Sequence, residues 1–162
     1  MTSATPGAAA PQVSEEMARL AAAVGWQGRE RVDRVEHRHL GDFLTAIAVD
    51  GRTAAAPAPG AVPDDLAVPP TLLCGFVDEP PECPAALAYG QGWLNGGDRF
   101  EYPEAAPELR LGDVLRSRTE LVEAVEKAGR SGRMAVLTFR TEFRRDDTGE
   151  VVARHVGTRI RR

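Results

Sequence analysis

The most constraining feature of this chain is a stretch of strict two-residue periodicity in its C-terminal third. Every second position there carries an apolar side chain or a threonine: Ala135, Leu137, Phe139, Thr141 and Phe143. Successive side chains of a strand point to opposite faces of a sheet, so this spacing predicts a strand with one buried face. Such a strand needs neighbours, and the flanking segments have the composition to provide them.

The segments on either side of this strand show related patterns. In the segment that begins at Val114, one face is formed by Leu115, Ser117, Thr119 and Leu121, and the other by Arg116, Arg118 and Glu120. The apolar residues change parity after Leu121, which predicts a bulge at that point. Asp146-Asp147-Thr148-Gly149 has the composition of a hairpin turn, and a last strand is predicted at 151–160. Consecutive strands joined in this way predict an antiparallel meander.

The N-terminal half is predicted to be mainly helical. Residues 1–13 are rich in Ala, Pro, Gly and Thr without periodicity and are predicted to be a disordered tail. A helix capped by Ser14 and ended by Gly25 follows. Residues 26–36 predict a strand at the solvent-exposed edge, and residues 40–48 predict an amphipathic helix closed by Asp50-Gly51.

A short apolar segment predicts how these elements are assembled. Pro69 and Pro70 favour a helix start, and the following residues 71–77 are apolar on every side. A helix without a polar face has to be enclosed by other elements. We therefore expect an α+β fold in which a curved antiparallel sheet wraps around a central helix at 70–77, with residues 14–162 forming one domain.

Several short segments, taken in order over residues 26–162, carry a family resemblance. They are Ala46-Ile47 with Asp50, Val68-Pro69-Pro70-Thr71, Leu94-Asn95-Gly96-Gly97-Asp98-Arg99-Phe100-Glu101-Tyr102, Leu111-Gly112-Asp113-Val114-Leu115 and Gly149-Glu150-Val151-Val152-Ala153. This arrangement resembles the N-terminal domain of MaoC-like dehydratases. That family has the hot-dog fold and is related to (R)-specific enoyl-CoA hydratases and to two-subunit hydroxyacyl-thioester dehydratases.

The resemblance implies a hydro-lyase that acts on enoyl or (R)-3-hydroxyacyl thioesters through an Asp-x4-His dyad in the loop after the helix. Asp50 stands at the position of the aspartate and is the candidate catalytic residue, but the residue five positions later is Ala55. No histidine occurs between His39 and His155. We therefore expect the substrate-shaping half of a two-chain enzyme, whose second hot-dog chain carries the dyad. Two alternatives are a non-catalytic acyl-thioester-binding module and a homodimer that uses carboxylates such as Asp50 or Asp98.

Five candidate substrate-binding residues, between positions 89 and 97, precede a strand predicted at 98–102. Asn95 has a side chain that can hydrogen-bond a thioester oxygen or form a turn, and the Gly96-Gly97 pair marks either a bulge or a close approach to pantetheine. Tyr89 and Trp93 are expected in the core or at its rim, and secondarily as channel walls. His155 is expected to be a packed sheet histidine and His39 a solvated or capping residue.

A sixth candidate, Arg154, belongs to a cluster of arginines: Arg140, Arg144, Arg145, Arg154, Arg159, Arg161 and Arg162. Three interpretations remain open for this cluster: binding of the phosphates of coenzyme A, docking of an acidic acyl carrier protein, or a solvated outer face of the sheet. The substrate would be carried on coenzyme A or a carrier protein, so no separate cofactor is expected.

Composition excludes several classes of protein. The net charge is −4 and no stacking motif accompanies the arginines, which argues against a nucleic-acid partner. No apolar stretch has the length of a transmembrane helix. Cys74 and Cys83 are expected to be interior thiols of a cytoplasmic protein rather than a disulfide. Two thiols without nearby histidines also do not form a zinc site.

Overall fold

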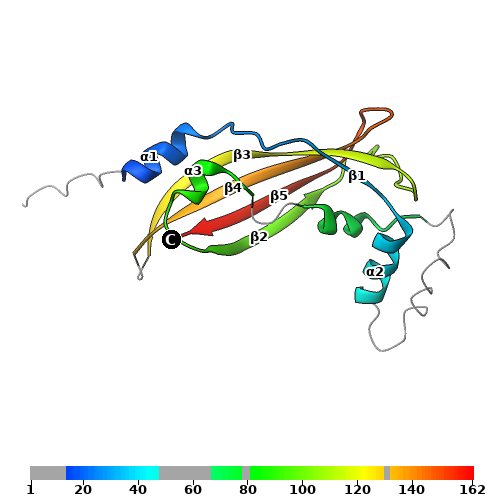
Figure 1. The fold of residues 1–162 in the computed structure, drawn as a ribbon, viewed down its shortest axis with the longest axis horizontal. Coiled ribbons are helices and arrows are strands. Elements are labelled where there is room, and N and C mark those ends of the chain that lie inside the picture. Colours follow the sequence, from blue (N-terminus) through cyan, green and yellow to red (C-terminus); the bar gives the residue numbers. More distant parts are fainter. Residues whose placement is uncertain (1–13, 48–66, 78–80, 130–131) are drawn as a thin grey trace, which may run out of the picture.

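The computed structural model describes residues 14–47, 67–77, 81–129 and 132–162. A five-stranded sheet is its main element (Figure 1). In chain order the elements are α1 (Glu15–Ala22), β1 (Arg31–Arg34), α2 (His37–Ile47), the 3₁₀-helix η1 (Pro70–Phe76), α3 (Pro84–Leu87), β2 (Trp93–Glu101), β3 (Val114–Gly129), β4 (Gly132–Arg145) and β5 (Val151–Arg161). The predicted α+β class is confirmed. The predicted tail at 1–13 and the helix end at Asp50-Gly51 lie outside the described residues.

The strands form one antiparallel sheet in the order β1-β3-β4-β5-β2. The consecutive neighbours β3, β4 and β5 make the predicted meander. The predicted bulge is present, because the register between β3 and β4 shifts between Leu121 and Glu123. The strand predicted at 26–36 is shorter than expected: β1 covers only Arg31–Arg34, and Gln27 adds an isolated bridge to Glu120. β1 and β2 are therefore the two edges of the sheet.

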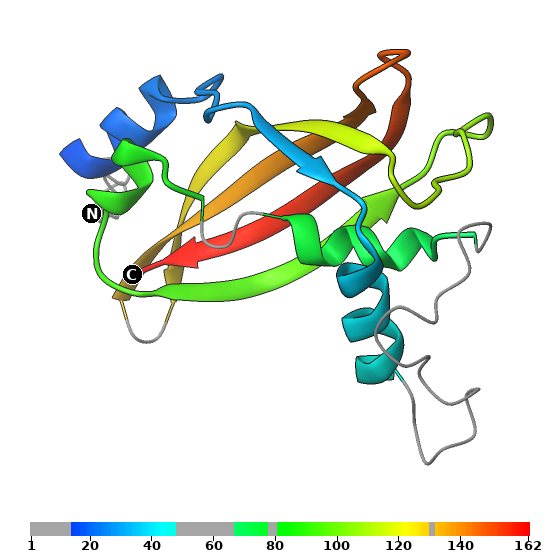
Figure 2. The same ribbon diagram turned by 45° about the vertical axis from the view of Figure 1, so that its right-hand side comes forward.

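Helices pack at both ends of the concave face of this curved sheet (Figure 2). The helix α1 begins as predicted, with the Ser14 hydroxyl accepting a hydrogen bond from the Met17 backbone N–H at 3.1 Å. It packs against β3 and α3, whereas α2 packs against η1. None of the helices in the described part of the chain has the length and apolar character needed to cross a membrane.

The central segment corrects one prediction. We expected residues 70–77 to be enclosed on all sides, but η1 buries only Leu72, Leu73 and Phe76 and leaves Thr71, Cys74 and Gly75 exposed. The cause is that η1 packs on the apolar cluster of the sheet with one side only, through Leu72, Leu73 and Phe76, and its other side faces solvent. Cys74 is therefore exposed rather than interior, although partial burial still raises the pKa of its thiol above the ordinary value. Cys83 is buried, as expected.

The arginine cluster also divides between two environments. Four arginines lie on the outer face of the sheet or beside it and form ion pairs there: Arg140 with Glu120 (2.8 Å), Arg144 with Glu142 (2.6 Å), Arg154 with Glu142 (2.8 Å) and Arg145 with Asp113 (3.2 Å). Arg159 and Arg161 do not belong to that face, because both side chains are buried on the inner side of β5. Of the three interpretations, a solvated outer face fits the first four arginines and does not fit Arg159 and Arg161.

The buried apolar side chains form two clusters, one at each end of the concave face. The cluster beneath η1 contains Val35, Val68, Leu72, Leu73, Phe76, Leu109, Leu115, Phe143, Val152 and Ala153. The cluster beneath α1 and α3 contains Met17, Leu20, Cys83, Ala86, Tyr89, Leu121, Ala135, Leu137 and Phe139. The residues between these clusters are polar, and several of them, including Thr119, Thr141, His155 and Arg159, are buried.

Candidate functional site

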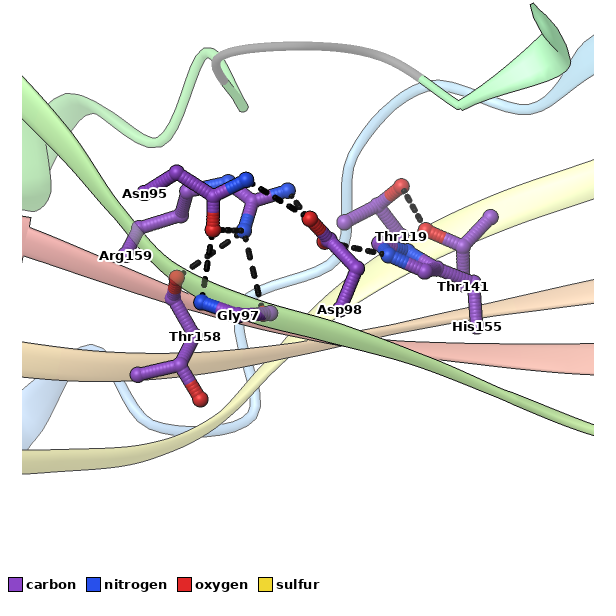
Figure 3. Close-up of polar contacts among 8 residues, drawn as sticks. All are labelled: Asn95, Gly97, Asp98, Thr119, Thr141, His155, Thr158 and Arg159. Atoms are coloured by element: carbon purple, nitrogen blue, oxygen red, sulfur yellow. Dashed lines mark hydrogen bonds and ion pairs between the residues drawn. The ribbon is translucent and has the colours of Figure 1, made fainter. Parts of the chain in front are cut away.

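Six polar side chains cross the sheet between the two apolar clusters, and we call them the polar belt: Asn95, Asp98, Thr119, Thr141, His155 and Arg159 (Figure 3). The strand register aligns part of the belt, because Thr119 is the partner of Thr141 and Thr141 is the partner of His155. Directly opposed residues of antiparallel strands have side chains on the same face. The belt therefore runs over the concave face from β3 to the edge strand β2.

Asp98 is the centre of the polar belt. Its Oδ1 lies 2.8 Å from His155 Nε2 and accepts a hydrogen bond from Arg159 Nη2 at 2.7 Å. Its Oδ2 accepts a hydrogen bond from the Asn95 amide at 2.7 Å. The side chain of Asp98 is 34% exposed, whereas those of His155 and Arg159 are 4% and 3% exposed. The belt is thus buried at one end and open to solvent at β2.

Arg159 is a charged side chain that is buried in the interior. Burial lowers the pKa of its guanidinium from the ordinary value, since a charged group loses hydration there. The Asp98 carboxylate compensates for that loss through a charge-assisted hydrogen bond. Further hydrogen bonds go to the Thr158 carbonyl oxygen at 2.9 Å and to the Asn95 side-chain oxygen at 3.2 Å.

A β-bulge brings Asn95 back towards Asp98. The register of β2 against β5 shifts between Asn95 and Gly97, and Gly97 has a φ of 133°, a conformation that favours glycine. The Asn95 side-chain oxygen accepts a hydrogen bond from the Gly97 N–H at 2.6 Å. Gly96 packs closely on β5, since a Cβ there would lie 2.8 Å from the Thr158 methyl group. The bulge predicted for this glycine pair is therefore present.

Gly157 is the floor of the site. A Cβ at this position would lie 2.8 Å from His155 Cε1, 3.1 Å from Arg159 Nη2 and 3.1 Å from Asp98 Oδ1. The three charged or titratable groups can therefore meet above β5 only because residue 157 has no side chain.

The sequence predictions did not identify the pair formed by Asp98 and His155. The two residues are 57 positions apart and meet through the pairing of β2 with β5. The sequence did contain one local indication. His155, Arg159 and Arg161 are all at odd-numbered positions of one strand, so these polar side chains share one face, with Gly157 between them. Val156 and Ile160 lie on the opposite face. His155 is packed within the sheet, as expected, with its ring centroid 4.9 Å from that of Phe100.

An apolar groove lies between residues 67–73 and 102–109. Its volume is about 330 Å³, and its lining is formed mainly by Val68, Pro69, Pro70, Leu73, Tyr102, Ala106, Pro107, Leu109 and Val152. Tyr102 donates a hydrogen bond to the Pro70 carbonyl oxygen at 3.1 Å, and burial raises the pKa of its phenol. The ring of Phe100 stacks on Tyr102 and also contacts His155, so Phe100 joins the groove to the belt.

The other predicted site residues lie elsewhere. Tyr89 is buried in the cluster beneath α1 and α3 and hydrogen-bonds Glu126, and Trp93 packs against Phe139 and the Arg161 guanidinium at the rim of that cluster. Arg154 lies on the outer face. Of the six candidate substrate-binding residues, the structure therefore groups only Asn95, Gly96 and Gly97.

The histidine and carboxylate candidates near α2 have different outcomes. His39 has the predicted capping role, since its Nδ1 accepts a hydrogen bond from the Glu36 backbone N–H at 3.4 Å. Asp50 and Ala55 lie outside the described residues. Within the described ranges no group of three or more His, Cys, Asp or Glu side chains is arranged to bind a metal ion.

Comparisons with known proteins agree with this architecture. A family model described as "FAS1-like, dehydratase domain region" matches residues 22–155. A comparison with curated proteins returned no match. The solved structures that share the fold include a MaoC-like dehydratase from Rhodospirillum rubrum (22% identity, 86% of this chain and 94% of that chain, TM-score 0.54).

Two further solved structures with this fold are complexes from Mycobacterium tuberculosis. One is the ChsH1-ChsH2 complex (18% identity, 91% of this chain and 89% of that chain, TM-score 0.62). The other is HadBC, a 3R-hydroxyacyl-ACP dehydratase complex (19% identity, 85% and 96%, TM-score 0.54). The family model shows that the chain belongs to the FAS1-like dehydratase-domain family, and the solved structures show that it shares the hot-dog fold of MaoC-like dehydratases.

Proposed function

We propose that this chain is the substrate-shaping subunit of a two-chain hydro-lyase that hydrates enoyl thioesters or dehydrates (R)-3-hydroxyacyl thioesters. In this proposal the groove beside Tyr102 holds the acyl chain, and a second hot-dog chain supplies the Asp-x4-His dyad. The thioester is carried on coenzyme A or an acyl carrier protein.

The observation that supports this proposal most directly is the apolar groove on the concave face. A volume of about 330 Å³ lined mainly by apolar side chains suits a hydrocarbon tail. Tyr102 and Phe100 continue the groove towards β2, where a thioester would leave the apolar lining and meet the polar side chains of Asn95 and Asp98. The chain's own residues would then bind and orient the substrate and exclude water from its tail.

The edge strand β2 supports the two-chain form of the proposal. Within the described residues its one strand neighbour is β5, so its other edge offers N–H and C=O groups for pairing. Leu94 and Tyr102, at the two ends of this edge, are 43% and 42% exposed. Structures with the same fold include complexes of two named chains, ChsH1-ChsH2 and HadBC.

The test is to co-express this chain with a hot-dog chain that contains the Asp-x4-His pattern. Hydration of a crotonyl thioester is then measured for each chain alone and for the pair. We expect activity only in the pair and its loss when the partner's dyad histidine is replaced. Full activity of this chain alone would overturn the two-chain proposal.

The role of the groove needs its own variant. Ala106→Phe places a ring in the groove, so we expect it to reduce turnover of a long-chain thioester at least tenfold more than turnover of crotonyl thioester. The neighbouring residue Ala105 is exposed and does not line the groove, so Ala105→Phe is the matched control. Equal effects of the two variants on both substrates would show that the acyl chain binds elsewhere.

A homodimeric enzyme is the second candidate, and one observation favours it. Asp98 is partly exposed and pairs with His155, so a carboxylate–histidine pair does exist in this chain. If the chain alone is active, we expect Asp98→Asn to abolish that activity. If the pair is required, the same variant should reduce stability more than turnover.

A further inference from the structure

The two ring nitrogens of His155 have different surroundings. Its Nε2 faces Asp98 Oδ1 at 2.8 Å, but its buried Nδ1 has no hydrogen-bond partner among the described residues. His155 as a whole is only 3% exposed. Buried polar atoms in folded proteins nearly always have a hydrogen-bond partner, so a site built in this way calls for a bound one.

The tautomer of His155 follows from its neighbours. Asp98 Oδ1 also accepts a hydrogen bond from Arg159 Nη2 at 2.7 Å, so it faces a permanent cation and acts as an acceptor. The proton between Asp98 and His155 then resides on Nε2. In the neutral ring this leaves a lone pair on Nδ1, which needs a donor.

A cavity of about 10 Å³ adjoins the imidazole ring. Its lining comprises Val77, Pro81, Thr119, Phe139, Thr141, His155, Gly157 and Arg159. A site that holds one water needs about 10–15 Å³ and two to four polar partners. The cavity meets the lower limit of that range and is too small for any acyl or phosphate group.

The threonine pair supplies the second partner. The Thr119 and Thr141 hydroxyls lie 2.8 Å apart, and one of them donates to the other. Two hydroxyl groups have two protons, and this bond uses one, so the other remains to be donated. Both threonines line the cavity.

We propose that this cavity is a binding site for one water molecule, which donates to His155 Nδ1 and accepts from a hydroxyl of the Thr119–Thr141 pair. The water completes a continuous hydrogen-bonded chain from the threonine pair through His155 to Asp98. A water molecule held against a neutral imidazole whose other nitrogen is fixed by a carboxylate is the arrangement used in general-base chemistry. The site is independent of the proposed function, because it requires neither substrate nor a partner chain.

The first test uses the unmodified full-length chain. Long-range ¹H–¹⁵N correlation spectra at neutral pH identify His155 as the signal absent from His155→Gln. We expect a protonated Nε2, an unprotonated Nδ1 and a cross-peak to a slowly exchanging water. An imidazolium or an Nδ1–H tautomer would overturn the proposal, as would a crystal structure in which Nδ1 binds a protein group.

The second test removes the hydroxyl partners. In the variant Thr119→Val/Thr141→Val, both partners of a buried hydrogen bond become apolar groups of the same shape, a change that proteins tolerate well. We expect loss of the water cross-peak and a shift of the Nδ1 resonance. Thr138→Val, on the outer face of β4, is the control and should keep both signals. Retention of the water in the double variant would show that the threonine pair does not bind it, contrary to the proposal.

Discussion

Arg159 and Arg161 are two residues apart on one strand, on the same face and equally buried, yet their guanidinium groups are held in different ways. Their exposed fractions are 3% and 5%. Arg159 is bound by side chains, chiefly Asp98, in a network that reaches solvent at β2. Arg161 is bound by backbone carbonyl oxygens.

Arg161 holds the segment of residues 86–92 through hydrogen bonds to backbone carbonyl groups. Its guanidinium donates to five carbonyl oxygens, those of Ala86 (3.0 Å), Leu87 (2.8 Å), Tyr89 (2.9 Å), Gly90 (2.9 Å) and Gly92 (3.0 Å). Its Cζ lies 4.8 Å from the centroid of the Trp93 ring. Because the carbonyls at the end of α3 carry a partial negative charge, a cation is favoured there. Arg161 therefore fixes the segment between α3 and β2.

The partners of a buried charge differ in what they fix. Backbone carbonyls tie Arg161 to one conformation of the chain. Arg159 is paired with the Asp98 carboxylate, which is partly exposed, so the network around Arg159 reaches the surface of the molecule.

The largest expected effect is on stability, from Arg161→Met. This change leaves five carbonyl groups of residues 86–92 without their donor, and the bonds to Ala86 and Tyr89 are buried. Each buried group that finds no other partner costs about 1–3 kcal/mol. We expect a loss of at least about 3 kcal/mol in the free energy of unfolding measured with urea. The exposed neighbour gives the control, since Arg162→Met should change stability by less than about 0.5 kcal/mol. A loss below 1 kcal/mol for Arg161→Met would mean that α3 is held mainly by apolar packing.

The next effect is expected for Asp98→Asn, which removes the charge opposite Arg159 and keeps the shape. Removing one partner of a fully buried pair costs about 3–5 kcal/mol, and we expect about 2 kcal/mol here because Asp98 is partly exposed. In the double variant Asp98→Asn/Arg159→Met the loss should be smaller than the sum of the single losses by at least about 1 kcal/mol. Strict additivity in urea unfolding would contradict a direct interaction between the two charges.

Local patterns were sufficient to predict much of the fold. The periodicity of β3 and β4, the bulge after Leu121 and the Ser14 cap depend on residues close in sequence, and all are present. The form of η1 was predicted wrongly, because apolar composition does not distinguish an enclosed α-helix from a 3₁₀-helix with one exposed side.

The candidate site was harder to predict because it depends on strand register. A shift of one residue in the pairing of β2 with β5 would turn every side chain of one strand to the other face. The bulge at Asn95–Gly97 introduces such a shift, so the approach of Asp98 to His155 follows from tertiary structure rather than from any local spacing. Alternation also predicts polar side chains outside, whereas Arg159 lies inside.

A third effect is expected at the floor of the belt. Gly157→Ala adds a methyl group within about 3 Å of the His155, Arg159 and Asp98 side chains, which must then move apart. Overpacking of this kind costs about 1–3 kcal/mol, and we expect about 1.5 kcal/mol together with a changed His155 resonance. Gly41→Ala is the control, because a Cβ at that position of α2 meets nothing within 4 Å. It should stabilise the chain by up to about 1 kcal/mol, since alanine favours a helix more than glycine does. Equal outcomes for the two glycines would show that the belt tolerates the extra methyl group.

The smallest effect tests the outer face of the sheet, where charges are paired in solvent. At Glu142, desolvation acts to raise the pKa, but hydrogen bonds from Arg154 and Arg144 outweigh it and lower the pKa from the ordinary value of 4.5. The stability from this carboxylate is therefore present above pH 4.5 and is lost as the pH falls through the lower folded-state pKa. Because partly exposed pairs contribute little, Glu142→Gln should reduce the difference in unfolding free energy between pH 7 and pH 3 by about 0.5 kcal/mol. Glu104→Gln, in an exposed turn, should leave that difference unchanged. An effect at Glu142 as large as that of Asp98→Asn would remove the distinction between the solvated charges of the outer face and the buried charges of the belt.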